Sequence, residues 1–212
     1  SYTLPPSCSS QTTTATAPLG VTPHEWTFRP SLVYYMPMGD ELTRDIALPF
    51  GKSGREKFEV DQGLGLGLAL EKRINDRWGL EGGFLFGQTE TTYELTTAGL
   101  TGKDSHNANY YALTVGPNFH LLKCSPDLYL GLFVGYGGIA DPNYWVFDHH
   151  FRASFDGRFI WGAQLGLDVP FSPVSDWGFH GGLRYFALSQ DTDAGEIDID
   201  PLLVEAGLSY KF

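Results

Sequence analysis

The stretch QGLGLGLALE, from Gln62 to Glu71, places leucine at every second residue and glycine or alanine between. Successive side chains of a β-strand point to opposite faces, so this alternation predicts a strand with one face of leucines and one of very small residues. Glycines at this spacing also occur in loops that bind dinucleotide phosphates, but that motif requires a helix directly after the loop. Another alternating stretch follows here, so the sequence favours a strand.

The same two-residue alternation recurs along the rest of the chain and predicts eight strands. In each of them one face carries bulky apolar side chains and the other carries glycine or polar residues. We expect the strands at about residues 25–38, 59–70, 78–87, 109–122, 128–138, 158–169, 177–186 and 199–212.

The exposed face decides the class of barrel. A soluble barrel buries its bulky face and seldom places glycine on its surface. A barrel in lipid exposes the bulky face to acyl chains and turns the small and polar face to the lumen. The sequence therefore predicts an all-β fold, an eight-stranded antiparallel transmembrane β-barrel of the outer-membrane type.

Composition and charge narrow the function classes. The 212 residues are 42% hydrophobic and 15% aromatic and include 26 glycines. The formal net charge is −11, with 14 Lys and Arg against 25 Asp and Glu, which excludes nucleic acid as a partner because phosphate binding needs a basic surface. The chain opens SYTLPPSCSS, with neither an initiator Met nor a signal peptide, which is typical of a processed protein outside the cytoplasm.

The connections indicate how the chain is organised. Residues 1–24 are rich in Ser, Thr and Pro and are expected to form a periplasmic N-terminal tail, with the barrel domain at residues 25–212. Long polar connections, at about 39–58, 95–108, 139–157 and 189–198, alternate with the short links EKRINDR, KCSPD and PFSPVSD. Outer-membrane barrels have long extracellular loops and short periplasmic turns, so both termini are expected in the periplasm.

Aromatic residues near the strand ends predict two girdles at the membrane surfaces. The periplasmic girdle would contain Trp26, Trp78, Trp177 and Tyr210, and the other Tyr93, Tyr111 and Tyr185.

The C-terminal sequence LLVEAGLSYKF resembles the last strand that outer-membrane proteins present to the barrel assembly machinery, with Tyr210 and Phe212 as its aromatic signal. Residues 26–212 resemble small eight-stranded barrels of the OmpX, OmpA-barrel and OmpW type. The segments DLYLGLFVGYGG, WGAQLGLD and DPLLVEAGLSYKF are most similar to OmpW-like chains. The resemblance implies a place in the outer membrane of a Gram-negative bacterium, among lipid and lipopolysaccharide, and a narrow channel for small hydrophobic molecules as one function. The tail departs from the family pattern.

Polar residues on the predicted lumen face form the main candidate site. They would line a solute path or pair with one another, and pairing is favoured because an eight-stranded barrel is only just wide enough for its own side chains. The lumen glycines leave space for water, for a small apolar ligand, or for a larger neighbour such as Arg29 or Tyr35. The polar set is Arg29, Glu81, Gln164, Asp168, His180, Arg184, Glu205 and Lys211.

The third long connection contains NYWVFDHHF. Its aromatic residues would be strand extensions or an interaction loop that contacts a partner, and both readings stay open: Tyr144, Trp145, Phe147 and Phe151. Asp148, His149, His150 and Ser154 offer a weak cluster for a lipid-modifying enzyme, but solvated loop residues are the favoured interpretation.

The last connection, SQDTDAGEIDID, offers carboxylates of the kind that Ca²⁺ prefers, at Asp191, Asp193 and Asp198. Their spacing is not that of an EF-hand, so an acidic rim is favoured and divalent bridging to lipopolysaccharide is the functional variant. Cys8 and Cys124 both fall in the periplasm, which is oxidising, and a disulfide that holds the tail beneath the barrel is expected.

Together these patterns favour a non-enzymatic integral outer-membrane barrel with a structural or interaction role, for example as an accessory subunit of a larger outer-membrane complex. No catalytic residue and no cofactor are expected. The alternatives are the narrow hydrophobic channel that the resemblance implies and, behind it, a lipid-modifying enzyme.

Overall fold

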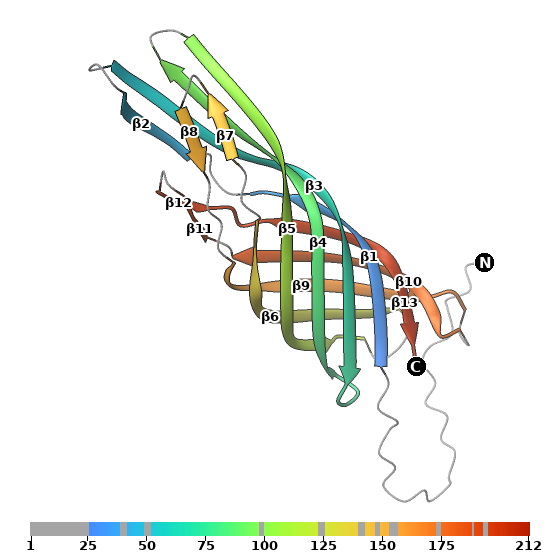
Figure 1. The fold of residues 1–212 in the computed structure, drawn as a ribbon. Helices are drawn as coiled ribbons and strands as arrows, with labels where there is room; N and C mark the ends of the chain where they lie inside the picture. The colour runs from blue at the N-terminus through green and yellow to red at the C-terminus, as the bar shows by residue number, and fades with distance from the viewer. Residues whose placement is uncertain are drawn as a thin grey trace, which may run out of the picture.

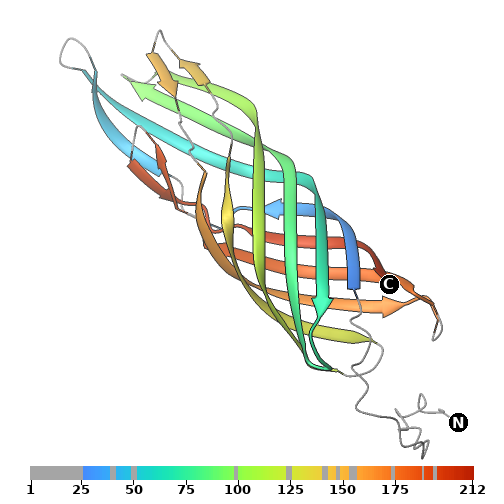
Figure 2. The ribbon, with the colours of Figure 1, turned by 60° about the horizontal axis from the view of Figure 1, so that its bottom comes forward.

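The computed structural model describes residues 26–38, 42–48, 52–97, 100–122, 126–139, 143–146, 149–152, 157–172, 175–187, 189–192 and 195–212. Eight long strands form a ring in the order β1, β3, β4, β5, β6, β9, β10, β13, and each neighbouring pair is antiparallel (Figures 1 and 2). The strands are β1 (Trp26–Met36), β3 (Lys52–Arg73), β4 (Trp78–Thr97), β5 (Leu100–His120), β6 (Asp127–Ile139), β9 (Arg158–Pro170), β10 (Trp177–Ala187) and β13 (Leu202–Lys211). The predicted eight-stranded antiparallel barrel is confirmed.

The ring closes between the first and last strands. The backbone N–H of Trp26 donates to the carbonyl of Phe212 at 2.8 Å, and the N–H of Phe212 donates to Trp26 at 2.9 Å. We call the end of the barrel that holds this pair the terminal end and the opposite end the distal end. Within the described ranges, no helix is long and apolar enough to span a bilayer.

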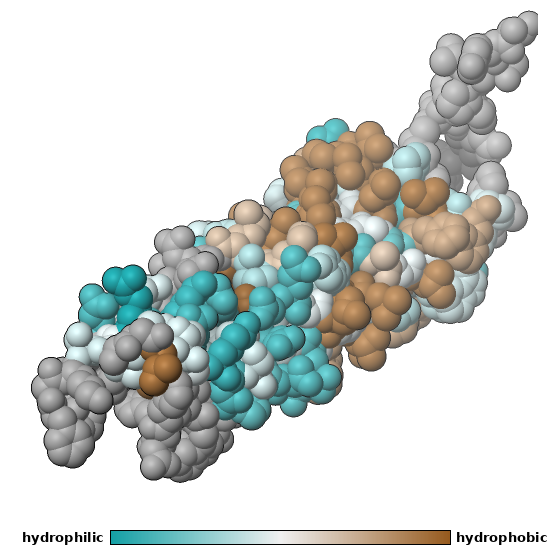
Figure 3. Space-filling view, turned by 90° about the horizontal axis from the view of Figure 1, so that it is seen from above, coloured by the Kyte–Doolittle hydropathy of each residue, from teal (hydrophilic) through white to brown (hydrophobic). Residues whose placement is uncertain are grey.

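The outer surface carries the bulky apolar face of every strand. In β3, Leu64 and Leu66 are 70% and 59% exposed, whereas Gly67 and Ala69, which lie between leucines, are buried. Apolar side chains gather over the terminal half of the barrel, and polar residues dominate toward the distal end (Figure 3). The leucines of QGLGLGLALE therefore face lipid, and its small residues face the lumen.

Five short strands lie on the connections, and β2 extends the sheet at its distal end. They are β2 (Leu42–Leu48), β7 (Asn143–Val146), β8 (His149–Arg152), β11 (Ser189–Thr192) and β12 (Gly195–Asp198). β2 pairs with the distal part of β3, β7 pairs with β8, and β11 pairs with β12.

The predicted connections at 39–58 and 95–108 were wrong in extent. β3, β4 and β5 contain 22, 20 and 21 residues, whereas a membrane strand needs about 9–11. Their distal halves continue past the apolar belt as polar, Thr-rich strands, and this part of the sequence lacks the alternation of bulky and small residues that marks a strand in lipid.

A β-bulge in β3 separates the two parts of the long strands. Val60 pairs with Thr91 and Gly63 with Thr89, so two residues of β3 oppose one of β4. The bulge exchanges the faces of β3, and Phe58 on its distal side is 2% exposed.

Tyr93, opposite Phe58, is also buried at 1% and donates to Glu56 at 2.8 Å. Its predicted place in a lipid-facing girdle is wrong. Tyr185 is 38% exposed, and Trp78 and Trp177 are exposed near the terminal end, as expected for girdle residues.

Candidate functional site

The lumen contains two layers of different chemistry. Residues near the terminal end of each strand supply the polar layer: Thr27, Arg29, Ser31, Glu71, Glu81, Thr114, Asn118, His120, Asp127, Gln164, Asp168, His180, Arg184, Glu205 and Ser209. Residues farther along the same strands supply the apolar layer: Val33, Tyr35, Phe58, Leu85, Tyr93, Leu95, Ala108, Tyr110, Ala112, Phe133, Ile139, Ile160, Phe186, Ile199 and Leu203. Both layers use the inward positions of the same strands.

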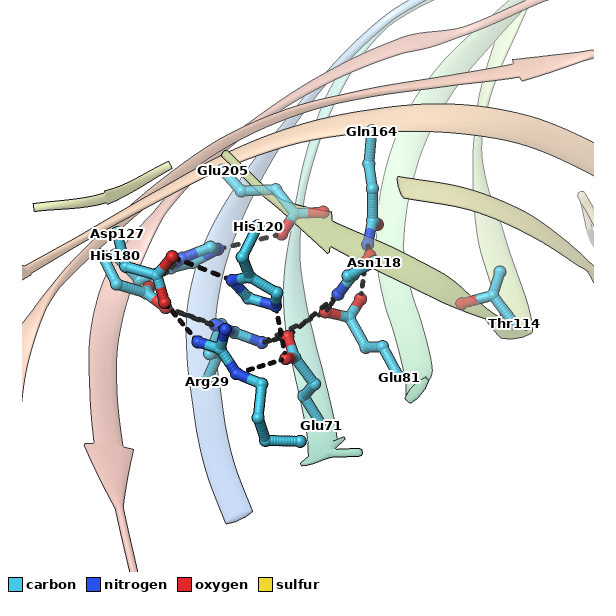
Figure 4. Close-up of polar contacts among 12 residues, drawn as sticks. Arg29, Glu71, Glu81, Thr114, Asn118, His120, Asp127, Gln164, His180 and Glu205 are labelled. Atoms are coloured by element: carbon cyan, nitrogen blue, oxygen red, sulfur yellow. Dashed lines mark hydrogen bonds and ion pairs between the residues drawn. The ribbon is translucent and has the colours of Figure 1, made fainter. Parts of the chain in front are cut away.

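Arg29 of β1 is the centre of the polar layer and is 1% exposed (Figure 4). Its guanidinium lies 2.9 Å from the Glu71 carboxylate, 3.2 Å from Glu81 and 2.8 Å from Asp168. The guanidinium also lies over the ring of Tyr129, 4.8 Å from its centroid. Three carboxylates from three strands therefore converge on one buried cation, which compensates their removal from water.

Arg184 of β10 extends the network toward the apolar layer. It lies 3.1 Å from Glu81 and 3.2 Å from Glu205. Gln164 donates to Glu81 at 3.0 Å and to Asn118 at 2.7 Å. Amide and guanidinium donors thus satisfy most of the carboxylate oxygens in the layer, as a stable buried network requires.

Two histidines complete the network, and carboxylates face both nitrogens of each ring. For His120, Asp127 lies 2.8 Å from Nδ1 and Glu71 2.8 Å from Nε2. For His180, Asp168 lies 2.9 Å from Nδ1 and Glu205 3.7 Å from Nε2. This arrangement suits the imidazolium form, in which both nitrogens donate.

The charges in the layer then balance. With both imidazoles protonated, Arg29, Arg73, Arg184, His120 and His180 face the carboxylates of Glu71, Glu81, Asp127, Asp168 and Glu205. Ion pairs and hydrogen bonds join strands on different sides of the barrel (Figure 4), as expected for an eight-stranded barrel whose interior is filled by its own side chains.

The structure places seven of the eight predicted lumen residues in this network. Lys211 is the exception: it pairs in the sheet with Thr27, is half-buried and lies apart from the ion pairs. The predicted set left out Glu71, Arg73, Asn118, His120 and Asp127, although the alternation near residues 109–122 already places Asn118 and His120 on the inward face. Glu71 continues the alternation of QGLGLGLALE, which could have identified it as an inward-facing residue. The charged run EKRINDR begins at the same residue, however, and its composition is typical of a turn.

Above the polar layer lies an apolar cavity of about 360 Å³, part of which is open to solvent. Its lining is Tyr35, Leu85, Tyr110, Tyr111, Ala112, Gly137, Gly138, Ile139, Ile160, Phe186, Pro201 and Leu203. Among these described residues, the tyrosine hydroxyls are the sole polar side-chain groups.

Gly65 of QGLGLGLALE and Gly87 of β4 make room for Tyr110. A Cβ at Gly65 would collide with the Tyr110 hydroxyl, and a Cβ at Gly87 on the neighbouring strand would collide with the same phenol. The expectation that Arg29 or Tyr35 occupies this space was wrong in part. Arg29 is opposite Ala69, and Tyr35 stacks on Tyr110, with ring centroids 4.9 Å apart. A strip without side chains on β3 and β4 thus supports an aromatic pair.

Several predicted sites lie outside the described residues or side chains. Cys8 and Cys124 are both outside, as is the tail at residues 1–24, so the disulfide and the tail stay predictions. Phe147 and Asp193 are outside, and the side chains of Tyr144, Trp145, Phe151, Asp191 and Asp198 are not described. In the part of the chain that is described, no group of three His, Cys, Asp or Glu residues could hold a metal ion.

Comparison with known proteins agrees with the fold. The model of the family described as outer membrane protein beta-barrel domain matches residues 44–212. OprG from Pseudomonas aeruginosa is similar with a TM-score of 0.67 and 17% identity, over 89% of this chain and 96% of that one. The outer membrane protein AlkL is similar with a TM-score of 0.56 and 15% identity, over 93% of this chain and 94% of that one. Neisserial surface protein A is similar with a TM-score of 0.50 and 14% identity, over 88% of this chain and 97% of that one. No curated protein sequence matches the chain.

Proposed function

The chain belongs to the outer membrane protein beta-barrel family and resides in the bacterial outer membrane, and we propose that it is a non-enzymatic barrel that takes up small hydrophobic molecules. The observation that carries the proposal is the apolar cavity stacked on a closed polar layer. A molecule that enters from the distal end, which we place on the cell exterior, meets a hydrophobic site first.

The polar layer argues against a straight path across the membrane. A hydrophobic molecule that moved farther would have to break buried ion pairs around Arg29, which costs several kcal/mol, about 3–5 for one lost partner. The layer therefore favours exit from the cavity through the barrel wall into lipid.

The wall beside the cavity offers such an exit. Tyr111 of β5 and Gly138 of β6 pair with each other at outward-facing positions and nevertheless line the cavity. Gly138 has no side chain, so the wall is thin where these strands meet. We propose that molecules leave the cavity here and join the acyl chains of the outer membrane.

Entry of a small hydrophobic fluorophore, N-phenylnaphthylamine, into vesicles with a lipopolysaccharide outer leaflet tests this function. Reconstituted protein is expected to speed entry above that of protein-free vesicles. Ile160→Trp fills the cavity and should return entry to background, whereas Leu132→Trp on the lipid-facing surface, where Leu132 is 66% exposed, should leave it unchanged. Equal entry with wild type and Ile160→Trp, or a steady ion conductance in planar bilayers, would contradict the proposal.

An interaction role is the second candidate, and the long strands support it. The distal halves of β3, β4 and β5 stand above the apolar belt and carry polar side chains (Figure 3). Strands that continue beyond the membrane can contact other molecules outside it. Cross-linking in native membranes of wild type, and of a variant that lacks residues 42–58, would show whether a partner is lost with this surface.

A further inference from the structure

Two tyrosines in the cavity lining have hydroxyl groups without hydrogen-bond partners. The hydroxyl oxygens of Tyr35 and Tyr110 are both buried and unpaired, and the residues are 3% and 5% exposed. From these atoms we infer that the molecules bound in the cavity are not plain hydrocarbons: they carry an oxygen atom that pairs with these phenols. This inference rests on the proposed function and specifies its substrate class.

The energetics of buried polar groups favour a polar ligand atom here. A buried donor left unsatisfied costs about 1–3 kcal/mol, and most buried polar groups in folded proteins therefore have partners. In the polar layer below, Gln164 Oε1 and Glu205 Oε1 also lack a hydrogen bond, but Glu205 Oε1 lies 3.2 Å from the Arg184 guanidinium and the Gln164 amide donates to Glu81 and Asn118. Tyr35 and Tyr110 differ from these residues because their unpaired hydroxyls belong to the lining of an apolar cavity, where a bound ligand can supply the missing hydrogen bonds.

The backbone around the pair fixes where the phenols lie. Tyr35 comes from β1 and Tyr110 from β5, and their rings stack at 4.9 Å with an interplanar angle of 27°. Gly65 and Gly87 form the bare strip against which Tyr110 lies. The stack therefore holds the two phenols beside each other in the cavity lining.

The rest of the lining defines the ligand further. The side chains of Leu85, Ile139, Ile160, Phe186 and Leu203 suit an apolar body, and the described lining holds no charged residue that could pair with an ionised group. A phenol can donate to a carbonyl or ether oxygen and can both donate to and accept from an alcohol. The geometry points to small neutral oxygenated compounds, such as ketones, esters and alcohols, and away from carboxylates, whose burial without a partner is costly.

Two probes of nearly equal shape test the inference, cyclohexanone and methylenecyclohexane, which differ in one oxygen. Each is titrated against the full chain in lipid nanodiscs, and the methyl signals of Ile139 and Ile160 report occupancy at equal probe concentration in the membrane. Cyclohexanone is expected to bind about tenfold more tightly, the equivalent of one net hydrogen bond. In the double variant Tyr35→Phe, Tyr110→Phe that ratio should fall to about one, with binding of methylenecyclohexane unchanged.

Tyr111→Phe is the matched control, because Tyr111 lines the same cavity but its hydroxyl is not among the buried unpaired atoms. It should keep the tenfold ratio. Both Phe variants preserve ring size and remove no hydrogen bond found among the described residues, so the barrel is expected to fold normally. Equal binding of the two probes by wild type, or a ratio that survives in the double variant, would overturn the inference and leave the hydrophobic site standing. Binding of neither probe would overturn the proposed function as well.

Discussion

The two halves of the lumen are built on the same eight strands and differ in almost every physical respect. In the polar layer, buried charges are held in place by partners on other strands, such as Arg29 of β1 and Asp168 of β9. In the apolar layer, aromatic and aliphatic side chains surround a cavity, and two hydroxyls are left unpaired. The comparison shows that one half of the barrel is filled by paired charges, whereas the other half contains the apolar cavity to which we assign ligand binding.

The largest expected effect comes from removing the centre of the polar layer. Arg29→Met keeps an unbranched chain but leaves Glu71, Glu81 and Asp168 without their common cation. We expect a loss of about 3–5 kcal/mol in the free energy of unfolding, measured by urea titration in lipid vesicles.

The matched control is Arg55→Met, because Arg55 pairs with Asp45 where both side chains are 66% and 78% exposed. That substitution should cost less than about 1 kcal/mol. Similar losses for the two variants would show that the buried network contributes no more than a surface ion pair, and the contrast between the two layers would lose its basis.

A smaller effect is expected at the strip beneath the aromatic pair. Gly65→Ala places a methyl group against the Tyr110 hydroxyl and the Phe86 carbonyl, so the strand or the ring must shift. The expected loss is about 1–3 kcal/mol in the same urea titration. Gly82→Ala on the neighbouring strand is the control, because a Cβ there meets no atom within 4 Å. Equal stability of both variants would mean that Tyr110 is not held against the glycines.

The smallest effect tests whether a polar contact in the distal half stabilises the fold as strongly as the contacts around Arg29 do. Tyr93 donates to Glu56 at 2.8 Å, distal to the bulge, and burial beside this carboxylate raises the pKa of the phenol, which therefore keeps its proton over the usual pH range. Tyr93→Phe should cost about 1 kcal/mol, the usual net value of one hydrogen bond. A loss as large as that of Arg29→Met would place a second stabilising centre among the distal strands.

The sequence predicts the barrel well because each membrane strand carries its own signal. The alternation that assigns Leu64 and Leu66 to lipid depends on local geometry alone, and the burial of Gly67 and Ala69 on the opposite face follows. The network members on the predicted inward faces, such as Arg29 and Glu81, could be listed for the same reason.

Their partners could not be predicted in the same way. Arg29 and Asp168 are 139 residues apart, and their contact depends on the stagger of strands around the whole ring, which no single strand encodes. The position of the cavity could not be predicted from the sequence either. A glycine that lies against a side chain such as Tyr110 cannot be distinguished in the sequence from a glycine that lies beside empty space. The distal strands were missed because their Thr and charged residues lack the alternation that lipid imposes.

The bulge between Val60 and Gly63 determines which residues of β3 face the lumen on each side of it. On its terminal side the inward residues carry odd numbers, as Gly65 and Gly67 do, and on its distal side even numbers, as Glu56 and Phe58 do. The two segments are therefore in opposite phase, and one extra residue is the switch between them. A one-residue deletion there would leave composition and hydropathy almost unchanged and yet turn Phe58 and Glu56 outward. The number of residues in the bulge therefore determines which side chains face the lumen.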